Sequence, residues 1–254
     1  MLQIETIPCL SDNYAFLAHD PKSGATALVD APEAGPVLER LEQKGWALTH
    51  VLITHHHYDH VDGLADILAK HPAQVVGNNA DADRLPKLDI ALSDGDSLSI
   101  GEVEGTMFDV SGHTIGHVAF HFPTAKAVFT ADSLMALGCG RVFEGTKPQM
   151  YASLQRFVQM PPETLVCSGH EYTEANAKFA ITIDPQNSAL ISRISDIRAK
   201  RAAGEATVPS SLADELQTNP FLRAGDAGIR EHLGLQGASD EDVFTEIRTR
   251  KDNF

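Results

Sequence analysis

Apolar positions in the first part of the chain recur mainly in short runs that alternate with polar residues, which is the pattern of half-buried β-strands. The first three runs span residues 3–8, 14–19 and 25–30, and a Pro-Lys-Ser-Gly turn at 21–24 precedes the third. Strands of this length joined by turn residues favour antiparallel hairpins. The chain is therefore predicted to begin with antiparallel strands.

Apolar residues at helical spacing predict two helices among the strands, one over residues 36–44 that is closed by Gly45 and a shorter one that carries Leu64, Ile67 and Leu68. The remaining expected elements are strands at 48–54, 74–77, 98–100, 102–110, 118–122, 127–130 and 164–167, and a helix at 151–160. Strand-rich segments interleaved with helices indicate two mixed sheets with helices outside them.

The pattern changes after residue 172. From there apolar residues recur at helical spacing, and the helical stretches are broken at Asp184-Pro185, Pro209 and Pro220. We therefore expect an α+β fold in two domains. Residues 1–172 would form a sandwich of sheets and helices, and residues 173–254 a small all-helical domain.

Composition and charge narrow the classes of partner. Apolar residues make up 43% of the chain and charged residues 22%, as in ordinary soluble domains. The net charge of -15 opposes binding to nucleic acid, because its phosphates would be repelled. No apolar run approaches the ~20 residues that span a bilayer, and the first residues do not resemble a secretory signal. We expect a cytoplasmic monomer with neither a membrane nor a nucleic-acid partner.

Potential metal-binding side chains are most concentrated in the stretch T-H-H-H-Y-D-H at residues 54–60, which directly follows an apolar run. His55, His57, Asp59 and His60 are four potential metal ligands within six positions, which is more than one divalent ion can use. On a strand, alternate side chains share a face, so we expect His55, His57 and Asp59 to converge while His60 points towards a neighbouring ion. The alternative is a solvated polar loop, and this density of ligand types argues against it.

Three further residues of ligand type, His113, Asp132 and His170, follow predicted strands. The ligand sets expected for two ions, with Asp132 bridging them, are His55, His57 and His113 for one and Asp59, His60 and His170 for the other. Two cations lower the pKa of a shared water, so hydroxide becomes available near neutral pH. The chemistry indicated is hydrolysis, and Asp59 and Asp132 are the predicted catalytic residues. We expect two divalent ions, foremost Zn²⁺; iron and manganese also suit these ligands.

These residues carry a resemblance to the metallo-β-lactamase superfamily. T-H-H-H-Y-D-H matches its T-H-x-H-x-D-H signature, and Gly112-His113, Ala131-Asp132 and Gly169-His170 fall at its later ligand positions. Within the superfamily the chain resembles the glyoxalase II family. The segments that carry this similarity are L-S-D-N-Y from residue 10, G-C-G-R-V-F-E-G-T from 138, G-H-E-Y-T from 169, N-P-F-L-R from 219 and the terminal R-T-R-K-D-N-F.

The resemblance implies a metallo-β-lactamase αββα sandwich followed by a helical C-terminal domain. It also implies hydrolysis of S-D-lactoylglutathione to D-lactate and glutathione, a step of methylglyoxal detoxification. For substrate binding it indicates Arg141, Phe143, Tyr172, Arg248 and Lys251, matched by position. Phe143 stands where some members have a tyrosine, so that hydroxyl contact is lost. Arg141 replaces a lysine of some members and keeps the charge, although the two are not interchangeable.

Other functions are left open by the sequence. A persulfide dioxygenase has a similar fold with one iron held by two histidines and an aspartate, but a helical appendage that ends in Arg248 and Lys251 favours the hydrolase. A secreted β-lactamase is disfavoured by the missing signal and a nuclease by the acidic charge. A structural metal-binding module is disfavoured by the bridging Asp132, because structural zinc sites are closed and usually single.

Several neighbours of the expected ligands are given supporting roles. His56 should point away from the ions, and His117 should support the ligands or pack in the core. Cys139, between two glycines, is expected to be a buried small residue rather than a nucleophile. Residues 12–14 are expected to form a turn that supports the site.

Overall fold

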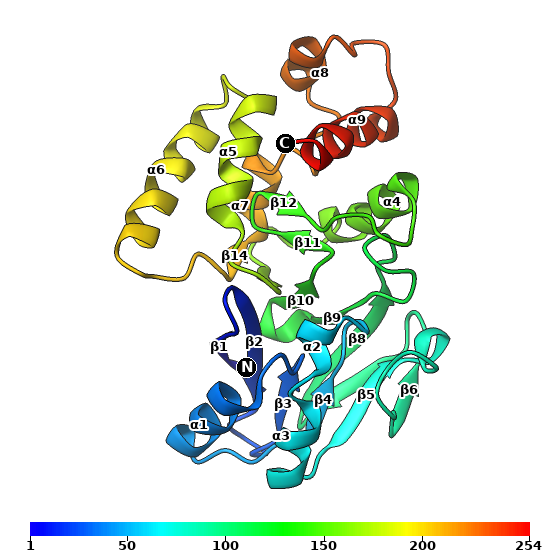
Figure 1. Cartoon of the computed structure of the whole chain (residues 1–254), viewed down its shortest axis with the longest axis vertical. Coiled ribbons are helices and arrows are strands. Elements are labelled where there is room, and N and C mark those ends of the chain that lie inside the picture. The colour runs from blue at the N-terminus through cyan, green and yellow to red at the C-terminus, as the bar shows by residue number, and fades with distance from the viewer. The chain divides into compact units, whose positions relative to one another are not determined.

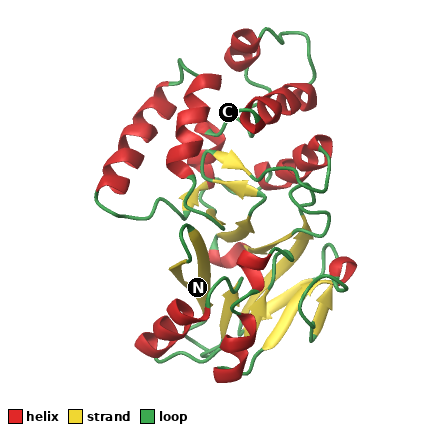
Figure 2. Cartoon of the chain, in the orientation of Figure 1, coloured by secondary structure: helices red, strands yellow, loops and turns green.

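The computed structural model describes all residues, 1–254, and they form two compact units. The first unit comprises Met1–Val110 and Ile115–Ala131, and the second comprises Ser111–Thr114 and Asp132–Phe254. Strands dominate the first unit and helices the second (Figure 2). No helix is both long and apolar enough to pass through a bilayer. The expected domain boundary at residues 172 and 173 stays a prediction.

The first unit contains two groups of strands. Its elements are β1 (Gln3–Cys9), β2 (Asn13–His19), β3 (Thr26–Val29), α1 (Ala34–Lys44), β4 (His50–Leu52), α2 (Tyr58–Val61), α3 (Leu64–Lys70), β5 (Gln74–Asn78), η1 (Asn79–Asp81), β6 (Ile90–Leu92), β7 (Ser97–Ile100), β8 (Val103–Asp109), β9 (Val118–Phe122), η2 (Pro123–Ala125) and β10 (Ala127–Ala131). β1 to β6 form one sheet in chain order, antiparallel up to β3 and parallel from β3 onward. β7 to β10 are antiparallel neighbours in sequence order.

The β1–β6 sheet of this unit is covered on both faces. Every residue of β2 is buried, and alternation sends Leu17 into an apolar cluster with Val37 of α1 and Ile67 of α3. The neighbouring Phe16 points to the opposite face of the sheet, where its ring centroid lies 5.7 Å from that of Phe129 on β10. Figure 1 shows α1 and α3 outside the strands. The layers of this unit are therefore helix, sheet and sheet, in agreement with the predicted sandwich.

The second unit is mainly helical. Its elements are β11 (Leu134–Met135), β12 (Gly138–Cys139), α4 (Lys147–Val158), β13 (Leu165–Ser168), α5 (Thr173–Ile183), α6 (Ser188–Ala202), β14 (Ser210–Ser211), α7 (Leu212–Thr218), α8 (Ala227–Leu233) and α9 (Asp240–Asp252). α5 and α6 pack together through a cluster that includes Ala180 and Leu190. α4 meets α9 where the rings of Tyr151 and Phe244 are 5.6 Å apart.

Asparagine side chains hold the tight β11–β12 hairpin. The Nδ2 group of Asn219 donates hydrogen bonds to the carbonyls of Met135 at 3.1 Å and Gly138 at 3.0 Å. Asn176 donates to the carbonyl of Ala136 at 3.1 Å. These carbonyls lie in buried backbone, where an unpaired acceptor would be unfavourable. The N-P-F-L-R segment therefore has a structural function at the hairpin.

Glu215 of α7 completes the attachment of the hairpin. Its side chain is fully buried, accepts the backbone N–H of Leu137 at 2.9 Å and forms an ion pair with Arg193 of α6. Leu137 has a φ of 56°, an uncommon value for a residue other than glycine. Helices α6 and α7 thus fix the turn of the hairpin, and the chain that leaves it reaches Arg141 two residues after β12.

The predicted elements agree with the structure except at short strands, at the four-residue helix α2 and at element ends. The helix predicted to close at Gly45 does so, with Gly45 in the left-handed conformation at φ 67°. The strand predicted over 48–54 is only β4, because the chain leaves the sheet after Leu52. β6, β11, β12 and β14 were not predicted, since two or three residues carry too little periodicity. β14 also means that the helical region contains one short strand, which pairs with β13.

Candidate metal centre

The first unit supplies four ligand-type residues from one loop and one helical turn. His55 and His57 lie on irregular backbone after β4, and His57 is the N-cap of α2. α2 carries Asp59 and His60. The predicted strand alternation through Asp59 is therefore wrong, because the chain turns into a helix directly after His57 and redirects the side chains that follow.

These side chains nevertheless converge. The ring centroid of His55 lies 4.7 Å from that of His57 and 4.2 Å from that of His60. Nε2 of His60 is 3.9 Å from Oδ2 of Asp59. His55 and His60 are fully buried, whereas His57 and Asp59 are partly exposed, so the cluster extends from the interior to the surface.

Asp30, which sequence reasoning missed, orients two of the histidines. Its Oδ2 lies 2.7 Å from Nδ1 of His60 and accepts the hydroxyl of Thr54 at 2.8 Å, while its Oδ1 accepts the Thr54 N–H at 2.9 Å. Because the Thr54 hydroxyl donates to Asp30, its oxygen can accept from Nδ1 of His55, 3.0 Å away. With Nδ1 engaged in both rings, Nε2 is the atom that each ring could offer to a metal ion. The only sequence signal for Asp30 is its position at the end of a predicted strand.

Asn13 orients the carboxylate of the same cluster. Its side-chain amide donates to Oδ2 of Asp59 at 3.0 Å and to the Asp59 backbone carbonyl at 3.1 Å. Asn13 is 4% exposed and is the first residue of β2. Asn13 therefore contacts a candidate ligand directly, which is the supporting role expected of residues 12–14. The expected turn is wrong for Asn13 and Tyr14, which belong to β2, and only Asp12 lies in the turn before it.

In the second unit one carboxylate oxygen lies close to two histidines. Oδ2 of Asp132 is 3.4 Å from Nε2 of His113 and 3.3 Å from Nε2 of His170. Two ligands that each lie about 2.0–2.1 Å from one tetrahedral zinc ion are separated by roughly 3.3 Å. Each measured distance therefore matches one edge of a zinc coordination shell. This position suits an oxygen shared by two ions, one beside each histidine.

Glycines allow the backbone to approach these ligands closely. A Cβ atom on Gly140 would overlap the backbone carbonyl of Asp132. At Gly112, with a φ of 151°, a Cβ atom would meet Met150 at 2.8 Å. Ala131, directly before Asp132, has a φ of 39°, a conformation that is uncommon outside glycine and turns the chain sharply at the end of β10. The last glycine of the G-C-G segment, Gly140, is thus required by packing against the candidate ligand Asp132.

The donor chemistry fits divalent metal ions. Nδ1 of His113 lies 2.8 Å from the backbone carbonyl of Arg141, to which it donates, so this ring also presents Nε2. Buried imidazoles held through Nδ1, together with carboxylates, are suited to zinc, iron or manganese. The supporting partners Asp30 and Asn13 are of the kind that metal sites use to fix their ligands.

Three residues expected to bind substrate lie at the surface next to ligands of the second unit. The ring of Phe143, 61% exposed, is 5.3 Å from that of His113. The guanidinium of Arg141 lies 5.7 Å from the centre of the Phe143 ring and forms no ion pair. Tyr172 stacks on His170, with ring centroids 4.6 Å apart and planes 7° from parallel.

Arg248 is placed differently from these three. It is only 4% exposed, and its guanidinium is paired with Asp252 at 2.9 Å and donates to the carbonyl of Cys139 at 3.0 Å. It also lies 5.2 Å from the centre of the Phe221 ring. The structure therefore gives Arg248 a role in holding the hairpin backbone next to Arg141.

Lys251, one turn further along α9, is the more available cation. Its Nζ lies 5.1 Å from the ring of Phe179 and 5.3 Å from that of Phe254, and it has no carboxylate partner. Burial lowers the pKa of Lys251 below its ordinary value, and the neighbouring Arg248 charge acts in the same direction.

Other residues near the ligands have structural surroundings. His117 is fully buried and stacks on His55 with ring centroids 4.5 Å apart. Nδ1 of His56 lies 3.5 Å from Oδ2 of the buried Asp81. Burial raises the pKa of Cys139 to about 11, so this thiol stays protonated and is a poor nucleophile near neutral pH.

The sequence matches known families over nearly its whole length. A family model described as "Metallo-beta-lactamase superfamily" matches residues 13–170, and one described as "Hydroxyacylglutathione hydrolase C-terminus" matches residues 171–254. A protein of Ruegeria pomeroyi named hydroxyacylglutathione hydrolase is 59% identical over 100% of this chain and 99% of its own length. One of Jannaschia sp. with the same name is 60% identical over 99% of this chain and 98% of its own.

Solved structures agree in fold. ETHE1 from Myxococcus xanthus has a TM-score of 0.68 at 24% identity and is matched over 99% of this chain and 91% of its own. TTHA1623, solved in a di-iron-bound form, has a TM-score of 0.63 at 23% identity over 87% of this chain and 100% of its own. With the α+β fold, the histidine and aspartate clusters and the full-length relatives in agreement, the chain belongs to the hydroxyacylglutathione hydrolase family of the metallo-β-lactamase superfamily.

Proposed function

We propose that the protein hydrolyses the thioester of S-D-lactoylglutathione to D-lactate and glutathione, as its relatives' name, hydroxyacylglutathione hydrolase, describes. The identity of 59% or more over full length supports the same reaction here. The match of residues 171–254 to the C-terminal model of that family supports the glutathione-type substrate. The choice of the lactoyl group is part of the proposal.

We assign two divalent ions to the histidine and aspartate clusters. The proposed ligands are His55, His57 and His113 for one ion and Asp59, His60 and His170 for the other. Asp132 is proposed to bridge the two ions. The observation that carries this assignment is the position of Asp132 Oδ2, 3.4 Å from His113 and 3.3 Å from His170. Zinc is the proposed metal, and the di-iron form of a protein with the same fold makes iron the alternative.

When bound, the ions would polarise the thioester carbonyl, lower the pKa of the attacking water and stabilise charge on the carbonyl oxygen. The chain's own residues hold this arrangement: Asn13 fixes Asp59, and Asp30 fixes His60. The leaving thiolate needs little protonation, since a thiol pKa of about 8.5 is close to the working pH. No side-chain nucleophile is required, in agreement with the buried, protonated Cys139.

Substrate recognition is proposed to rest on cations without carboxylate partners. Glutathione carries two carboxylates, and neither Arg141 nor Lys251 is ion-paired. Phe143 and Tyr172 would provide exposed ring surface beside the ligands. Arg248, whose charge is paired with Asp252, would support recognition by holding the carbonyl of Cys139 beside Arg141. A locally basic surface in a chain of net charge -15 would direct an anionic substrate to the site.

The second candidate, a dioxygenase with a single iron held by two histidines and an aspartate, is less supported. The C-terminal model matched by residues 171–254 is that of the hydrolase.

We further propose a cytoplasmic monomer with no nucleic-acid partner and a domain boundary at residues 172 and 173. The acidic charge supports the absence of a nucleic-acid partner. The deciding experiment is a thioester assay before and after metal removal.

A further inference from the structure

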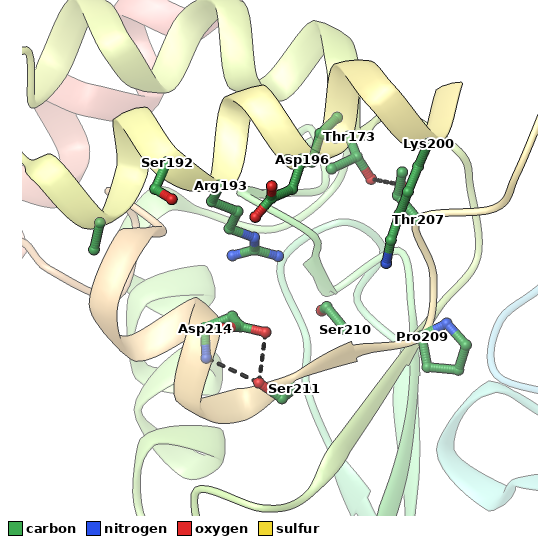
Figure 3. A pocket seen from close by; sticks show the side chains of 12 residues that line it. Thr173, Ser192, Arg193, Asp196, Lys200, Thr207, Pro209, Ser210, Ser211 and Asp214 are labelled. Atoms are coloured by element: carbon green, nitrogen blue, oxygen red, sulfur yellow. Dashed lines mark hydrogen bonds between the residues drawn. The ribbon is translucent and has the colours of Figure 1, made fainter. Parts of the chain in front are cut away.

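A pocket of about 360 Å³ lies among the helices of the second unit (Figure 3). Its walls come from α5, α6, β14 and the start of α7. None of its lining residues is assigned above to metal or substrate binding. It is lined by several hydroxyl groups and by charges of both signs.

The positive charge available in the pocket is Lys200. It lies near the end of α6, is exposed and has no ion-pair partner, and Figure 3 shows its ammonium group directed into the pocket. Arg193 also points into the pocket, but its charge is balanced by the ion pair with buried Glu215, and it donates to Thr218 at 2.7 Å.

Two carboxylates lie on the side of the pocket where Arg193 is found, away from Lys200 (Figure 3). Asp196 has no ion-pair partner. Asp214 accepts the hydroxyl of Ser211 at 2.7 Å and likewise has no cationic partner. Figure 3 shows the guanidinium of Arg193 between these two carboxylates, where its charge is balanced by Glu215. The pocket therefore has two carboxylates without ion-pair partners on this side and the unpaired ammonium of Lys200 on the other.

Ser210 lies between these charges. It is 8% exposed, and its hydroxyl is buried without a hydrogen-bond partner. Figure 3 shows the hydroxyl directed into the pocket between Asp214 and Lys200. A buried hydroxyl without a partner is unfavourable, and a polar ligand at this position would satisfy it.

We propose that this pocket binds an α-amino-acid group, the ammonium and carboxylate carried on one carbon atom. The ammonium would contact Asp196 and Asp214, and the carboxylate would contact Lys200 and the Ser210 hydroxyl. A simple anion would meet two carboxylates, and a simple cation would meet Lys200 and Arg193, so a ligand with both charges is matched better than either. Such a group occurs in free amino acids and in the γ-glutamyl end of glutathione, the product of the proposed reaction.

The test is calorimetric titration of the metal-loaded, full-length protein with L-glutamate, and separately with glutathione. N-acetyl-L-glutamate, which lacks the ammonium, and inorganic phosphate serve as control ligands. We expect L-glutamate to bind at one site per chain, and N-acetylation to weaken this binding about tenfold, the equivalent of ~1.4 kcal/mol.

Substitutions of two lining residues test whether L-glutamate binds in this pocket. Lys200→Met and Asp214→Asn should each weaken L-glutamate binding about fivefold or more, by loss of one charged contact. Asparagine keeps an oxygen for the Ser211 hydroxyl, so the start of α7 is preserved. Lys178→Met is the matched control, because Lys178 is an exposed lysine of α5 outside this pocket. It should leave L-glutamate binding unchanged.

The glutathione titration distinguishes the two sources of the ligand and does not depend on catalysis. A glutathione site that Lys200→Met removes would assign the product as a ligand, whereas glutamate binding alone would assign free amino acids. The proposal is overturned if neither ligand binds, if Lys200→Met and Asp214→Asn leave binding unchanged, or if phosphate or N-acetyl-L-glutamate binds as tightly as L-glutamate. Failure of thioester hydrolysis would instead count against the proposed function.

Discussion

Nδ1 of His60 lies 2.7 Å from Oδ2 of Asp30, and both side chains are buried. The same carboxylate accepts two hydrogen bonds from Thr54, whose hydroxyl is 3.0 Å from Nδ1 of His55. One carboxylate therefore fixes two candidate ligands that are proposed to serve different ions. This relationship predicts that both ions depend on Asp30, although Asp30 is not in either proposed ligand set.

Replacement of Asp30 by alanine should weaken metal binding by about 10–100-fold, the usual effect of removing the partner that holds a ligating histidine. Metal affinity would be measured by competition with a coloured chelator, and metal content by elemental analysis. Asp66→Ala, at an exposed position on α3, is the control. Unchanged affinity in Asp30→Ala would show that the rings are held by other contacts.

Asp132→Ala should abolish thioester hydrolysis. Its Oδ2 is the oxygen placed to be shared by two ions, and its loss removes both a ligand and the negative charge between them. Activity and metal content should fall together. Near-normal turnover with two bound ions would refute the assignment of the bridge.

Lys251→Met should raise the Michaelis constant about tenfold with little change in kcat, since a charge-assisted hydrogen bond contributes about 1.5–3 kcal/mol to binding. Its lowered pKa adds a pH dependence. As pH rises, the wild-type residue loses its charge earlier than an ordinary lysine would, so the Michaelis constant of the wild type should increase on the alkaline side.

That alkaline increase should be absent in Lys251→Met, in which no proton is lost at this position. Steady-state kinetics across pH would measure it. Lys178→Met, which removes an exposed lysine of α5 paired with Glu174, should behave like the wild type. Parallel pH profiles for the wild type and Lys251→Met would exclude the proposed substrate contact.

The candidate ligands and most of the strands could be predicted from the sequence, because both depend on residues that are close together in the chain. His55 to His60 lie within six positions, and apolar alternation marked the strands that precede His113, Asp132 and His170. The direction of Asp59 was not predictable, since one helical turn after His57 decides it and four residues show no periodicity. Asp30 was missed for another reason: a lone aspartate after a strand usually reads as a turn residue.

The burial of charged residues whose partners are distant in the chain could not be predicted from the sequence either. Arg248 reads as an exposed residue of a charged helix, and its burial depends on the carbonyl of Cys139, 109 positions earlier. Likewise, Glu215 reads as a surface residue of a short helix, yet it is fully buried because it accepts the N–H of Leu137, 78 positions away. Pairings of this kind follow from the fold and leave no local pattern.

Glu215→Gln should destabilise the protein by about 3 kcal/mol, because it leaves Arg193 without its buried partner and weakens the bond to Leu137. The free energy of unfolding would be measured with denaturant. Glu246→Gln is the matched control: Glu246 pairs with Arg250 at an exposed position, where an ion pair contributes about 0–1 kcal/mol. Equal effects of the two substitutions would contradict the role of Glu215.

The most direct test of the proposed function follows the thioester absorbance of S-D-lactoylglutathione with protein of measured metal content. The assay is made on the metal-loaded protein, after chelation, and during stepwise return of Zn²⁺. We predict rapid hydrolysis that is lost on chelation and restored as the metal content approaches two ions per chain. Absence of hydrolysis by fully metallated protein, or hydrolysis that survives complete metal removal, would contradict the account.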